Sequence, residues 1–212
     1  MSAEATLYDY WRSSASYRVR IALNSLGISY TRISVDLLQA EHKSAENLSR
    51  NPQGLVPTLV LDGHAFTQSL AIIEYLNEIF PEAGFLPANA LGRQRVRALS
   101  YAIAMEIHPV CNMNVAAHIV SLTGGGDDAR TSWMRKFISE GLTSFERMLN
   151  HSETGMFCHG DKPGMADFCL VPQVYNAKRW GADIGNLVRI NEIAGRCGAL
   201  PAFAGAHPDQ VK

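Results

Sequence analysis

The stretch RSSASYRVRIAL, residues 12–23, places Arg12 and the hydroxyls of Ser13, Ser14 and Ser16 at the start of an expected helix. Hydroxyl donors and the backbone N–H groups of a helix start both stabilise negative charge. No cysteine lies in this stretch, so we expect that the attacking group these residues would serve comes from outside the protein. The alternative is that the three serines simply cap the helix.

The composition is that of an ordinary globular protein, with 47% hydrophobic residues, 18% charged residues and a formal net charge of −1. This balance gives no reason to expect nucleic acid or a membrane surface as a partner. No run approaches the roughly 18 apolar residues of a membrane span. The first residues lack the pattern of a signal peptide, so we expect a cytoplasmic protein.

The sequence gives little support for metal chemistry or for the common hydrolytic mechanisms. The four cysteines form no C-x-x-C pair and the histidines form no H-E-x-x-H motif, so we expect neither a disulfide framework nor a metal site. The sequence also contains no G-x-S-x-G motif and no Walker loop. Hydrolases and nucleoside triphosphatases of the usual kinds therefore have little support.

Hydrophobic periodicity predicts alternating strands and helices in the first 80 residues. Apolar residues after Ser16 recur at helical spacing up to Gly27, and Asp62-Gly63 is a favoured hairpin turn. We expect strands at 5–11 and 29–37, a partly helical segment at 40–51, a hairpin at 55–69, and a helix at 69–80 capped by Ser69. The predicted order is therefore β-α-β-α-β-β-α.

The remainder of the chain is predicted to be helical. A connector with proline and glycine at 81–92 is the best candidate for a domain boundary. Beyond it we expect a long helix at 93–122 divided by Pro109, a break at 124–128, and helices at 130–149, from about Ala166 with a bend at Pro172, and at 186–197. The predicted domains are residues 1–82 and 90–212.

A small β-α-β-α-β-β-α domain followed by an all-helical domain is the layout of soluble glutathione transferases. Four motifs in order, RSSASYRVRIAL, NPQGLVPTLVLDG, QSLAIIEYL and ADFCLVPQV, resemble the zeta class of that family, the maleylacetoacetate isomerases. The similarity extends from Leu7 to about Gly198. It implies a thioredoxin-like domain that binds glutathione, a helical domain that binds substrate, and a homodimer.

Two positions depart from the family pattern. The family reads S-S-C-S in its first motif, and Ala15 stands here where the cysteine would be. A helix cap of the form S/T-x-x-D is replaced by Gly164-Met165-Ala166-Asp167. Glycine at the first position costs only about a few tenths of a kcal/mol as an N-cap, so we expect Asp167 still to brace the helix start.

The resemblance selects Ser14, paired with Arg18, as the main donor to the glutathione sulfur, with Ser13 as second choice. A hydrogen bond to a charged group contributes roughly 1.5–3 kcal/mol and a helix start roughly 0.3–1 kcal/mol. At about 1.4 kcal/mol per pKa unit, these interactions lower the thiol pKa from about 8.5 by about one to three units. The bound thiol would then be mostly ionised at pH 7.

The resemblance also implies the rest of the glutathione site. Val56 would pair through its backbone, before a cis-Pro57, with the cysteinyl part of the peptide, and Gln68 and Ser69 would hold the γ-glutamyl carboxylate. His42 would reach the glycyl end, while His108 and Asn112 would line the cleft, unless these three are ordinary surface or helix-end groups. The implied contacts are Ser13, Ser14, Ala15, Ser16, Tyr17, Arg18, His42, Val56, Pro57, Gln68, Ser69, His108 and Asn112.

The implied reaction is the cis–trans isomerisation of maleylacetoacetate in aromatic amino-acid catabolism, including that of tyrosine. The glutathione thiolate adds to the double bond, the resulting single bond rotates, and the thiolate leaves. Arg12 and Arg179 would hold the substrate carboxylates and the enolate, unless they form ordinary surface ion pairs. The alternatives are a maleylpyruvate isomerase, a general glutathione transferase or dehalogenase of small electrophilic acids, and a non-catalytic binding module.

Overall fold

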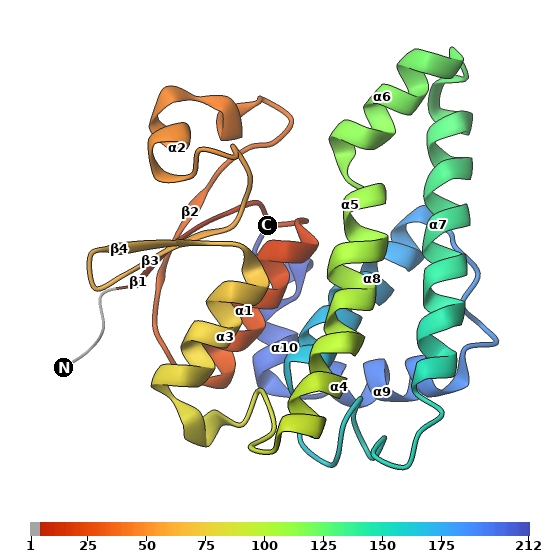
Figure 1. Cartoon of the computed structure of the whole chain (residues 1–212). Helices are drawn as coiled ribbons and strands as arrows, with labels where there is room; N and C mark the ends of the chain where they lie inside the picture. The colour runs from red at the N-terminus through yellow and green to blue at the C-terminus, as the bar shows by residue number, and fades with distance from the viewer. Residues whose placement is uncertain (1–4) are drawn as a thin grey trace. The chain divides into compact units, whose positions relative to one another are not determined.

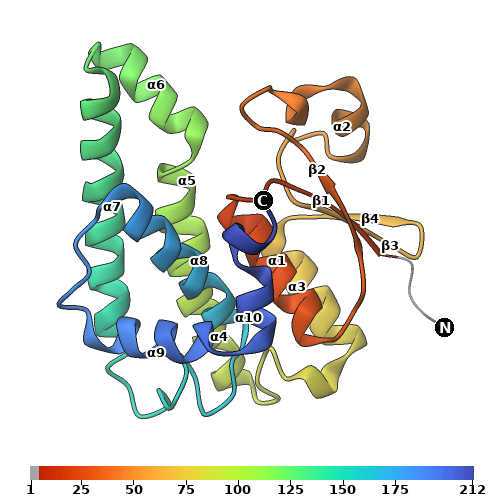
Figure 2. The same cartoon turned by 180° about the vertical axis from the view of Figure 1, so that it is seen from behind.

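A computed structural model describes residues 5–212, which divide into two compact units. The first unit comprises the described residues up to Leu86 together with Ala199–Lys212, and the second comprises Pro87–Gly198. The C-terminal segment, residues 199–212, thus joins the first unit, whereas the sequence assigned it to the helical domain. The reason is that helix α10 (Pro201–Ala206) packs on helix α1 (Ser14–Ser25), as Figure 2 shows.

The described residues of the first unit form one four-stranded sheet in the order β2-β1-β3-β4. Its strands are β1 (Ala5–Asp9), β2 (Thr31–Ser34), β3 (Thr58–Leu61) and β4 (His64–Thr67). Strand β1 runs parallel to β2 and antiparallel to β3, and the fully buried Leu7 and Leu59 face each other across that central pair. Asp62 and Gly63 have φ of 49° and 82°, which confirms the expected hairpin turn.

Helices α1 and α3 (Ser69–Ile79) lie side by side on one face of the sheet (Figure 1). Their buried apolar residues, such as Ile21 on α1 and Leu76 on α3, form much of the core of this unit. The connection from β2 to β3 carries the short helices η1 (Glu41–Lys43) and α2 (Ala45–Arg50), and η2 (Pro81–Ala83) follows α3. The predicted thioredoxin-like arrangement is therefore confirmed.

The second unit is helical, as predicted, and its long first helix is interrupted. Its elements are α4 (Ala90–Tyr101), the π-helix η3 (Ala102–Ile107), α5 (His108–Val110), α6 (Met113–Thr123), α7 (Gly126–Met148), α8 (Met165–Trp180) and α9 (Val188–Gly198). Pro109 supplies no N–H to the helix, and the regular α-helix is lost on both sides of it. Within residues 5–212, no helix combines the length and apolarity that crossing a bilayer requires.

Several helical elements differ from the sequence prediction. Helix α7 begins at Gly126 rather than 130, because Asp127 and Asp128 in its first turn favour a helix start. Helix α10 and the short η4 (Pro208–Gln210) were not predicted. Their sequence, PAFAGAHPDQ, is too short and too rich in small residues to show helical periodicity.

Asp167 braces the start of α8, as expected. One carboxylate oxygen, Oδ2, accepts a hydrogen bond from the backbone N–H of Gly164 at 2.9 Å. The other, Oδ1, accepts one from the N–H of Cys158, also at 2.9 Å. Because Asp167 is 1% exposed, water cannot replace either bond. The carboxylate thus joins the preceding loop to the helix.

Replacing Asp167 by alanine should destabilise the protein by about 2–4 kcal/mol, because the buried N–H of Cys158 and the partly buried N–H of Gly164 lose their acceptor. Urea unfolding measures this loss. The control is Asp183→Ala, which removes an exposed carboxylate that accepts from the Gly185 N–H at 3.0 Å. We expect that variant to change stability by no more than about 0.5 kcal/mol. Equal effects of the two substitutions would contradict the role given to Asp167.

Candidate active site

Ser13 is the N-cap of α1. Its backbone is extended, with φ −66° and ψ 120°, and its hydroxyl oxygen accepts a hydrogen bond from the Ser16 N–H at 3.2 Å. This contact satisfies one of the backbone donors that a helix start leaves without a partner. The Ser13 hydroxyl therefore already serves the helix.

Ser14, the first residue of α1, is placed differently. It is 9% exposed, and among residues 5–212 its hydroxyl has no hydrogen-bond partner. The first turn of α1 contains no acidic residue, so no side-chain carboxylate there offsets the positive end of the helix dipole. A hydroxyl donor without a partner at such a helix start is suited to binding an anion.

Arg18 does not pair with Ser14, contrary to the expectation. It is 2% exposed, and its Nη1 donates to Ser69 Oγ at 3.2 Å, which ties α1 to the start of α3. Ser69 is also not the N-cap of α3: Gln68 occupies that position, and Ser69 is the first helical residue. The sequence pattern cannot distinguish these neighbouring positions, because both lie directly before the apolar run.

The start of α3 has an unusual backbone. Gln68 has a φ of +67°, a region that residues other than glycine rarely adopt, and its Nε2 donates to Gln53 Oε1 at 2.7 Å. The first N–H groups of a helix have no partner within the helix and can bind a carboxylate. The assignment of Gln68 and Ser69 to the γ-glutamyl carboxylate remains a prediction that this geometry supports.

Two further predicted positions of the first unit lie in its loops. The Val56–Pro57 peptide bond is cis, as expected, and directly precedes β3. His42 lies in η1, and its Nδ1 is buried with no hydrogen-bond partner among the described residues. Partial burial, and then the charge of Lys43, lower the pKa of His42, so its imidazole is neutral at pH 7. A neutral imidazole can still donate or accept one hydrogen bond at each nitrogen.

Two residues of the predicted glutathione set turn their side chains into the core. Ser16 is fully buried, and Tyr17 is 2% exposed with its hydroxyl donating to Phe203 O at 3.4 Å. Ala15 has no functional group beyond its backbone. Any contact of a ligand with these three positions is therefore made by the backbone, which sequence spacing alone could not reveal.

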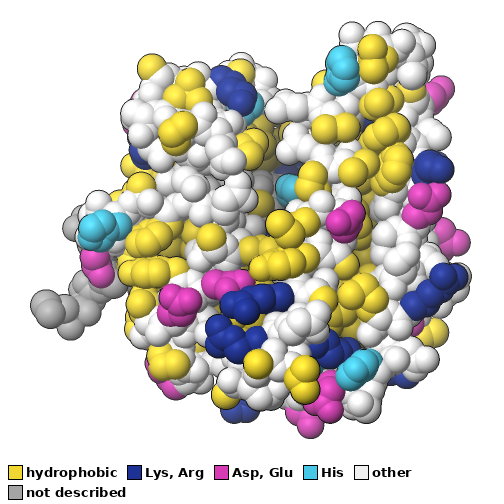
Figure 3. Space-filling model, in the orientation of Figure 1, with side chains coloured by type: hydrophobic (Ala, Val, Ile, Leu, Met, Phe, Trp, Pro, Cys, Tyr) yellow, Lys and Arg dark blue, Asp and Glu magenta, His cyan; other side chains and the backbone are white. Residues whose placement is uncertain are grey.

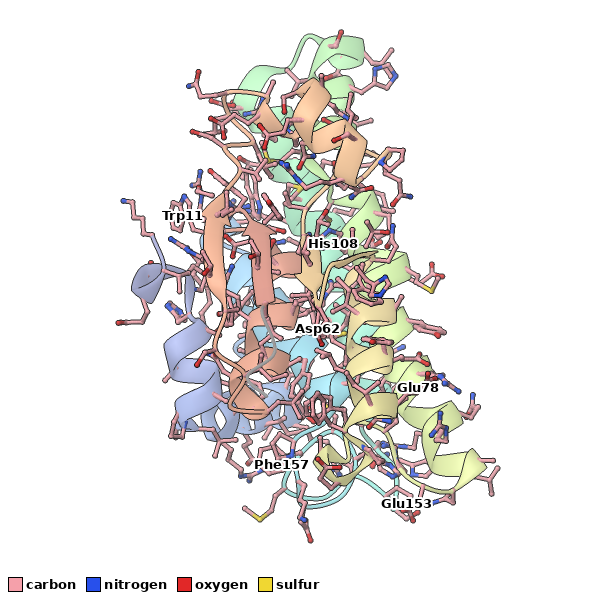
Figure 4. The ribbon with its side chains drawn as sticks, turned by 90° about the vertical axis from the view of Figure 1, so that its left-hand side faces the viewer. Trp11, Asp62, Glu78, His108, Glu153 and Phe157 are labelled. Carbon is pink, nitrogen blue, oxygen red and sulfur yellow. The ribbon has the colours of Figure 1, made fainter. Side chains whose placement is uncertain are left out.

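Arg12 is held by the aromatic residues before it. Its Nη2 donates to the Tyr10 hydroxyl at 3.1 Å, and its guanidinium carbon lies 4.7 Å from the ring centroid of Trp11. Trp11, labelled in Figure 4, follows the end of β1 and lies near the C-terminal segment. These contacts orient the Arg12 side chain, which is half-buried, while leaving it part of the surface.

The remaining predicted residues belong to the second unit. His108, labelled in Figure 4, is the first residue of α5, and Asn112 is the N-cap of α6, with Oδ1 accepting from the Asn114 N–H at 3.0 Å. Arg179 is exposed near the end of α8, where its Nη2 donates to Asn176 Oδ1 at 3.1 Å. Its guanidinium carbon lies 5.1 Å from the Trp180 ring centroid.

A cavity of about 660 Å³ in the second unit contains none of the predicted residues. It lies between the start of α4 and the segment that follows α7, with Arg95, Met148 and His159 in its wall. Arg95 donates to Cys158 O and Thr154 Oγ1, both at 2.7 Å. The guanidinium thus holds the loop in place, and we assign this cavity no part in the chemistry.

The protein's own thiols are unsuited to nucleophilic attack. All four cysteines are free and buried. Burial raises the pKa of Cys111 to about 11 and raises those of Cys158 and Cys197 above their ordinary value. A nucleophilic cysteine needs a lowered pKa and access to the substrate. These three thiols have neither, and helix α1 contains no cysteine that could supply a nucleophilic sulfur at its start.

The N-terminal part of the chain matches a known family model, and the whole chain matches named relatives. Residues 3–78 match the N-terminal domain of glutathione S-transferases. A maleylacetoacetate isomerase from Rhizobium meliloti (strain 1021) is 59% identical over all 212 residues, which is 100% of both chains. The chain belongs to the maleylacetoacetate isomerase family of zeta-class glutathione transferases. The resemblance carried by the four motifs is therefore confirmed.

Solved structures of the family share the fold throughout. A bacterial maleylpyruvate isomerase of the zeta class has a TM-score of 0.94 and 39% identity, covering 97% of both chains. A maleylacetoacetate isomerase from Anaeromyxobacter dehalogenans 2CP-1, with glutathione bound in its active site, has a TM-score of 0.89 and 39% identity. This match covers 99% of this chain and 97% of that one.

The residues of the first unit fit the family's cofactor, glutathione. Glutathione brings a thiol and two carboxylates, and this unit offers a helix start with an unpartnered hydroxyl at Ser14 and a second helix start at Ser69. The neutral imidazole of His42, with an unpartnered Nδ1, adds a further polar group. The donor set therefore matches the anionic groups of the tripeptide.

The two adjacent serines should respond to mutation in opposite ways. Ser14→Ala should raise the pKa of enzyme-bound glutathione by about one unit or more, because the thiolate loses a charge-assisted hydrogen bond. Ser13→Ala should leave that pKa nearly unchanged and lower stability by about 1 kcal/mol, because the helix loses its cap. Ultraviolet titration of the bound thiolate and urea unfolding measure the two effects. The reverse pattern would assign the donor role to Ser13.

Proposed function

We propose that this chain is a glutathione-dependent cis–trans isomerase that converts maleylacetoacetate to fumarylacetoacetate in aromatic amino-acid catabolism. The observation that carries the proposal is the Ser14 hydroxyl, which has no partner among the described residues and lies at a helix start without acidic residues. Glutathione, when bound, supplies the thiolate that adds to the double bond of the substrate. Addition makes this bond single, and the thiolate leaves once the single bond has rotated. The protein supplies the charges and donors that hold both molecules.

Ser14 and the N-terminal turn of α1 have the task of keeping the thiol ionised. The hydroxyl contributes roughly 1.5–3 kcal/mol and the helix start roughly 0.3–1 kcal/mol. These contributions lower a thiol pKa from about 8.5 by about one to three units, so no general base is needed at pH 7. The Val56 backbone and the start of α3 hold the rest of the peptide.

Arg12 and Arg179 have the task of binding the substrate carboxylates and the enolate formed on addition. A guanidinium binds a carboxylate through two parallel N–H donors, which fixes the orientation of the substrate as well as its charge. Arg12 is pre-oriented by Tyr10 and Trp11, and Arg179 by Asn176 and Trp180. Each of these four neighbours is uncharged and helps to orient the guanidinium beside it.

Maleylpyruvate is the second candidate substrate, and the structural similarity to a maleylpyruvate isomerase favours it. We favour maleylacetoacetate because the relative with 59% identity is named a maleylacetoacetate isomerase, whereas the maleylpyruvate isomerase structure has 39% identity. The deciding experiment measures kcat/KM for both compounds with glutathione, alongside conjugation of a chlorinated acid. Faster turnover of maleylpyruvate would reassign the substrate, and isomerisation by enzyme freed of glutathione would overturn the mechanism. Binding of glutathione without any turnover would leave only a binding module.

We also propose that the protein is a cytoplasmic homodimer. Four buried thiols without disulfides suit a reducing compartment such as the cytoplasm.

An apolar surface on the first unit supports the homodimer. On the face seen in Figure 3, hydrophobic side chains gather over β4 and α3. Phe66 of β4 stacks on Tyr75 of α3 with ring centroids 4.4 Å apart, and Ile79 of α3 is 43% exposed. An apolar surface of this kind favours association with another protein surface. Light scattering should give twice the chain mass of 23.2 kDa, and a monomer mass would contradict the dimer.

Arg179→Ala should raise KM for the substrate by about tenfold or more while leaving glutathione affinity nearly intact, because a charged hydrogen bond worth about 1.5–3 kcal/mol is lost. Arg179→Lys should restore only part of the loss, because an ammonium lacks the bidentate fork. Steady-state kinetics with each component varied in turn measures both effects. Equal losses toward glutathione and substrate would mean that Arg179 has a structural role instead.

A further inference from the structure

Arg20 is a fully buried arginine in the middle of α1, and its guanidinium donates in three directions. Its Nη1 contacts Asp9 Oδ2 at 2.5 Å, its Nη2 donates to Trp11 O at 3.0 Å, and its Nε donates to Ala206 O at 3.1 Å. A planar fork with several fixed N–H groups can satisfy three acceptors at once, which an ammonium or a carboxamide cannot do in the same geometry.

Two of the three acceptors belong to the segment that leads into α1, one directly before its turn and one within it. Asp9 is the last residue of β1, and Trp11 directly precedes Arg12. The same turn is closed by a hydrogen bond from the Ser13 N–H to Tyr10 O at 2.9 Å. Arg20, two turns along the helix, therefore fixes the backbone from which Arg12, Ser13 and Ser14 project.

The third acceptor belongs to the C-terminal segment, which also contacts the end of α1, strand β2 and the Trp11 ring of the turn. Asn24 Nδ2 donates to Ala202 O at 3.1 Å, Arg32 donates to Val211 O, and Lys212 Nζ lies 5.3 Å from the Trp11 ring centroid. In Figures 1 and 2 the C-terminus accordingly lies beside the start of α1. The end of the chain and the serine-bearing turn are thus joined through Arg20.

Stability alone does not account for a charge in this place. A buried ion pair can often be replaced by well-packed apolar residues with no loss of stability, because desolvation offsets the Coulombic attraction. The charges of Asp9 and Arg20 offset each other, and the second arginine near Asp9 is the partly exposed Arg32, 4.0 Å from Asp9 Oδ1. The pair instead fixes the orientation of the groups around it, because each N–H of the guanidinium holds one acceptor in place.

We propose that Arg20 is a positioning residue for the thiolate-binding turn, holding the Trp11 carbonyl so that the Ser14 hydroxyl meets the sulfur. This inference rests on the function proposed above. Arg20 touches neither glutathione nor substrate, and it acts through the backbone of residues 9–13. Its loss would therefore displace the donor without removing it.

The test compares Arg20→Lys with Asn24→Ala, which also loosens the C-terminal segment but does not touch the turn. We expect both variants to melt at lower temperature. Arg20→Lys should raise the pKa of bound glutathione by about half a unit or more and lower kcat by about tenfold at saturating glutathione, because small displacements of reacting groups have large effects on rate. Asn24→Ala should leave the pKa of bound glutathione nearly unchanged and kcat within about twofold of the wild-type value. If Arg20→Lys only matches Asn24→Ala in pKa and kcat, Arg20 is structural and the proposal is overturned.

A second variant keeps the test decisive if Arg20→Lys does not fold. The double variant Asp9→Leu with Arg20→Met replaces the buried ion pair by apolar side chains, which such sites tolerate. The folded double variant should show the raised thiol pKa and the lowered kcat, and wild-type values for both would overturn the proposal. Ser14→Ala, measured alongside, separates this proposal from the proposed function. If the thiol pKa rises in Ser14→Ala but not in the Arg20 variants, only the positioning role of Arg20 is overturned; if it does not change in Ser14→Ala, the donor role of Ser14 is overturned as well.

Discussion

Asp9 and Arg20 face each other in an interior that excludes water, and each charge is tolerated there because of the other. Burial raises the pKa of the Asp9 carboxyl, and the adjacent guanidinium opposes that change. The remaining N–H groups of Arg20 must also find acceptors, and they find them in two backbone carbonyls from distant parts of the chain. The end of β1, the helix α1 and the C-terminal segment are therefore organised around one guanidinium.

The neighbouring serines show how a helix start can be capped and still keep a hydroxyl donor for an anion. Ser13 satisfies one orphan N–H from within the chain, while the Ser14 hydroxyl has no partner within residues 5–212. Had an aspartate taken the place of either residue, its negative charge would have neutralised the site that a thiolate needs. Ala15, which has no thiol, is compatible with this arrangement, because the glutathione cofactor brings a thiol of its own.

Much of the fold could be predicted from local sequence signals. Alternation and helical periodicity identified the strands and most helices, and Asp62-Gly63 identified the hairpin. The errors arise where the determining contact is distant in sequence. Arg18 bonds to Ser69 rather than Ser14, and Tyr17 turns toward Phe203, because the tertiary structure brings those partners close. The short α10 has no periodicity to detect, so nothing local assigned the C-terminal segment to the first unit.

Family resemblance names the residues of the candidate site, but the sequence predicts their geometry only in part. The motif around Ser14 and the cis bond at Val56–Pro57 follow from family resemblance, and the structure contains both. Which serine caps the helix depends on a single backbone dihedral pair at Ser13, and a sequence of adjacent serines does not encode that choice visibly. The role of Arg20 was missed because its three acceptors lie 9 to 186 residues away along the chain.

The return of residues 199–212 to the first unit makes that unit discontinuous in sequence, with consequences for how the chain is made. During synthesis at about 5–20 residues per second, more than a hundred residues of the second unit follow Leu86 before the segment that completes the first unit exists. Throughout that interval, on the order of ten seconds, the Arg20 Nε–H lacks its native acceptor and the face of α1 under α10 stays uncovered. The first unit is therefore begun before the second unit and finished after it, and residues 199–212 complete its packing.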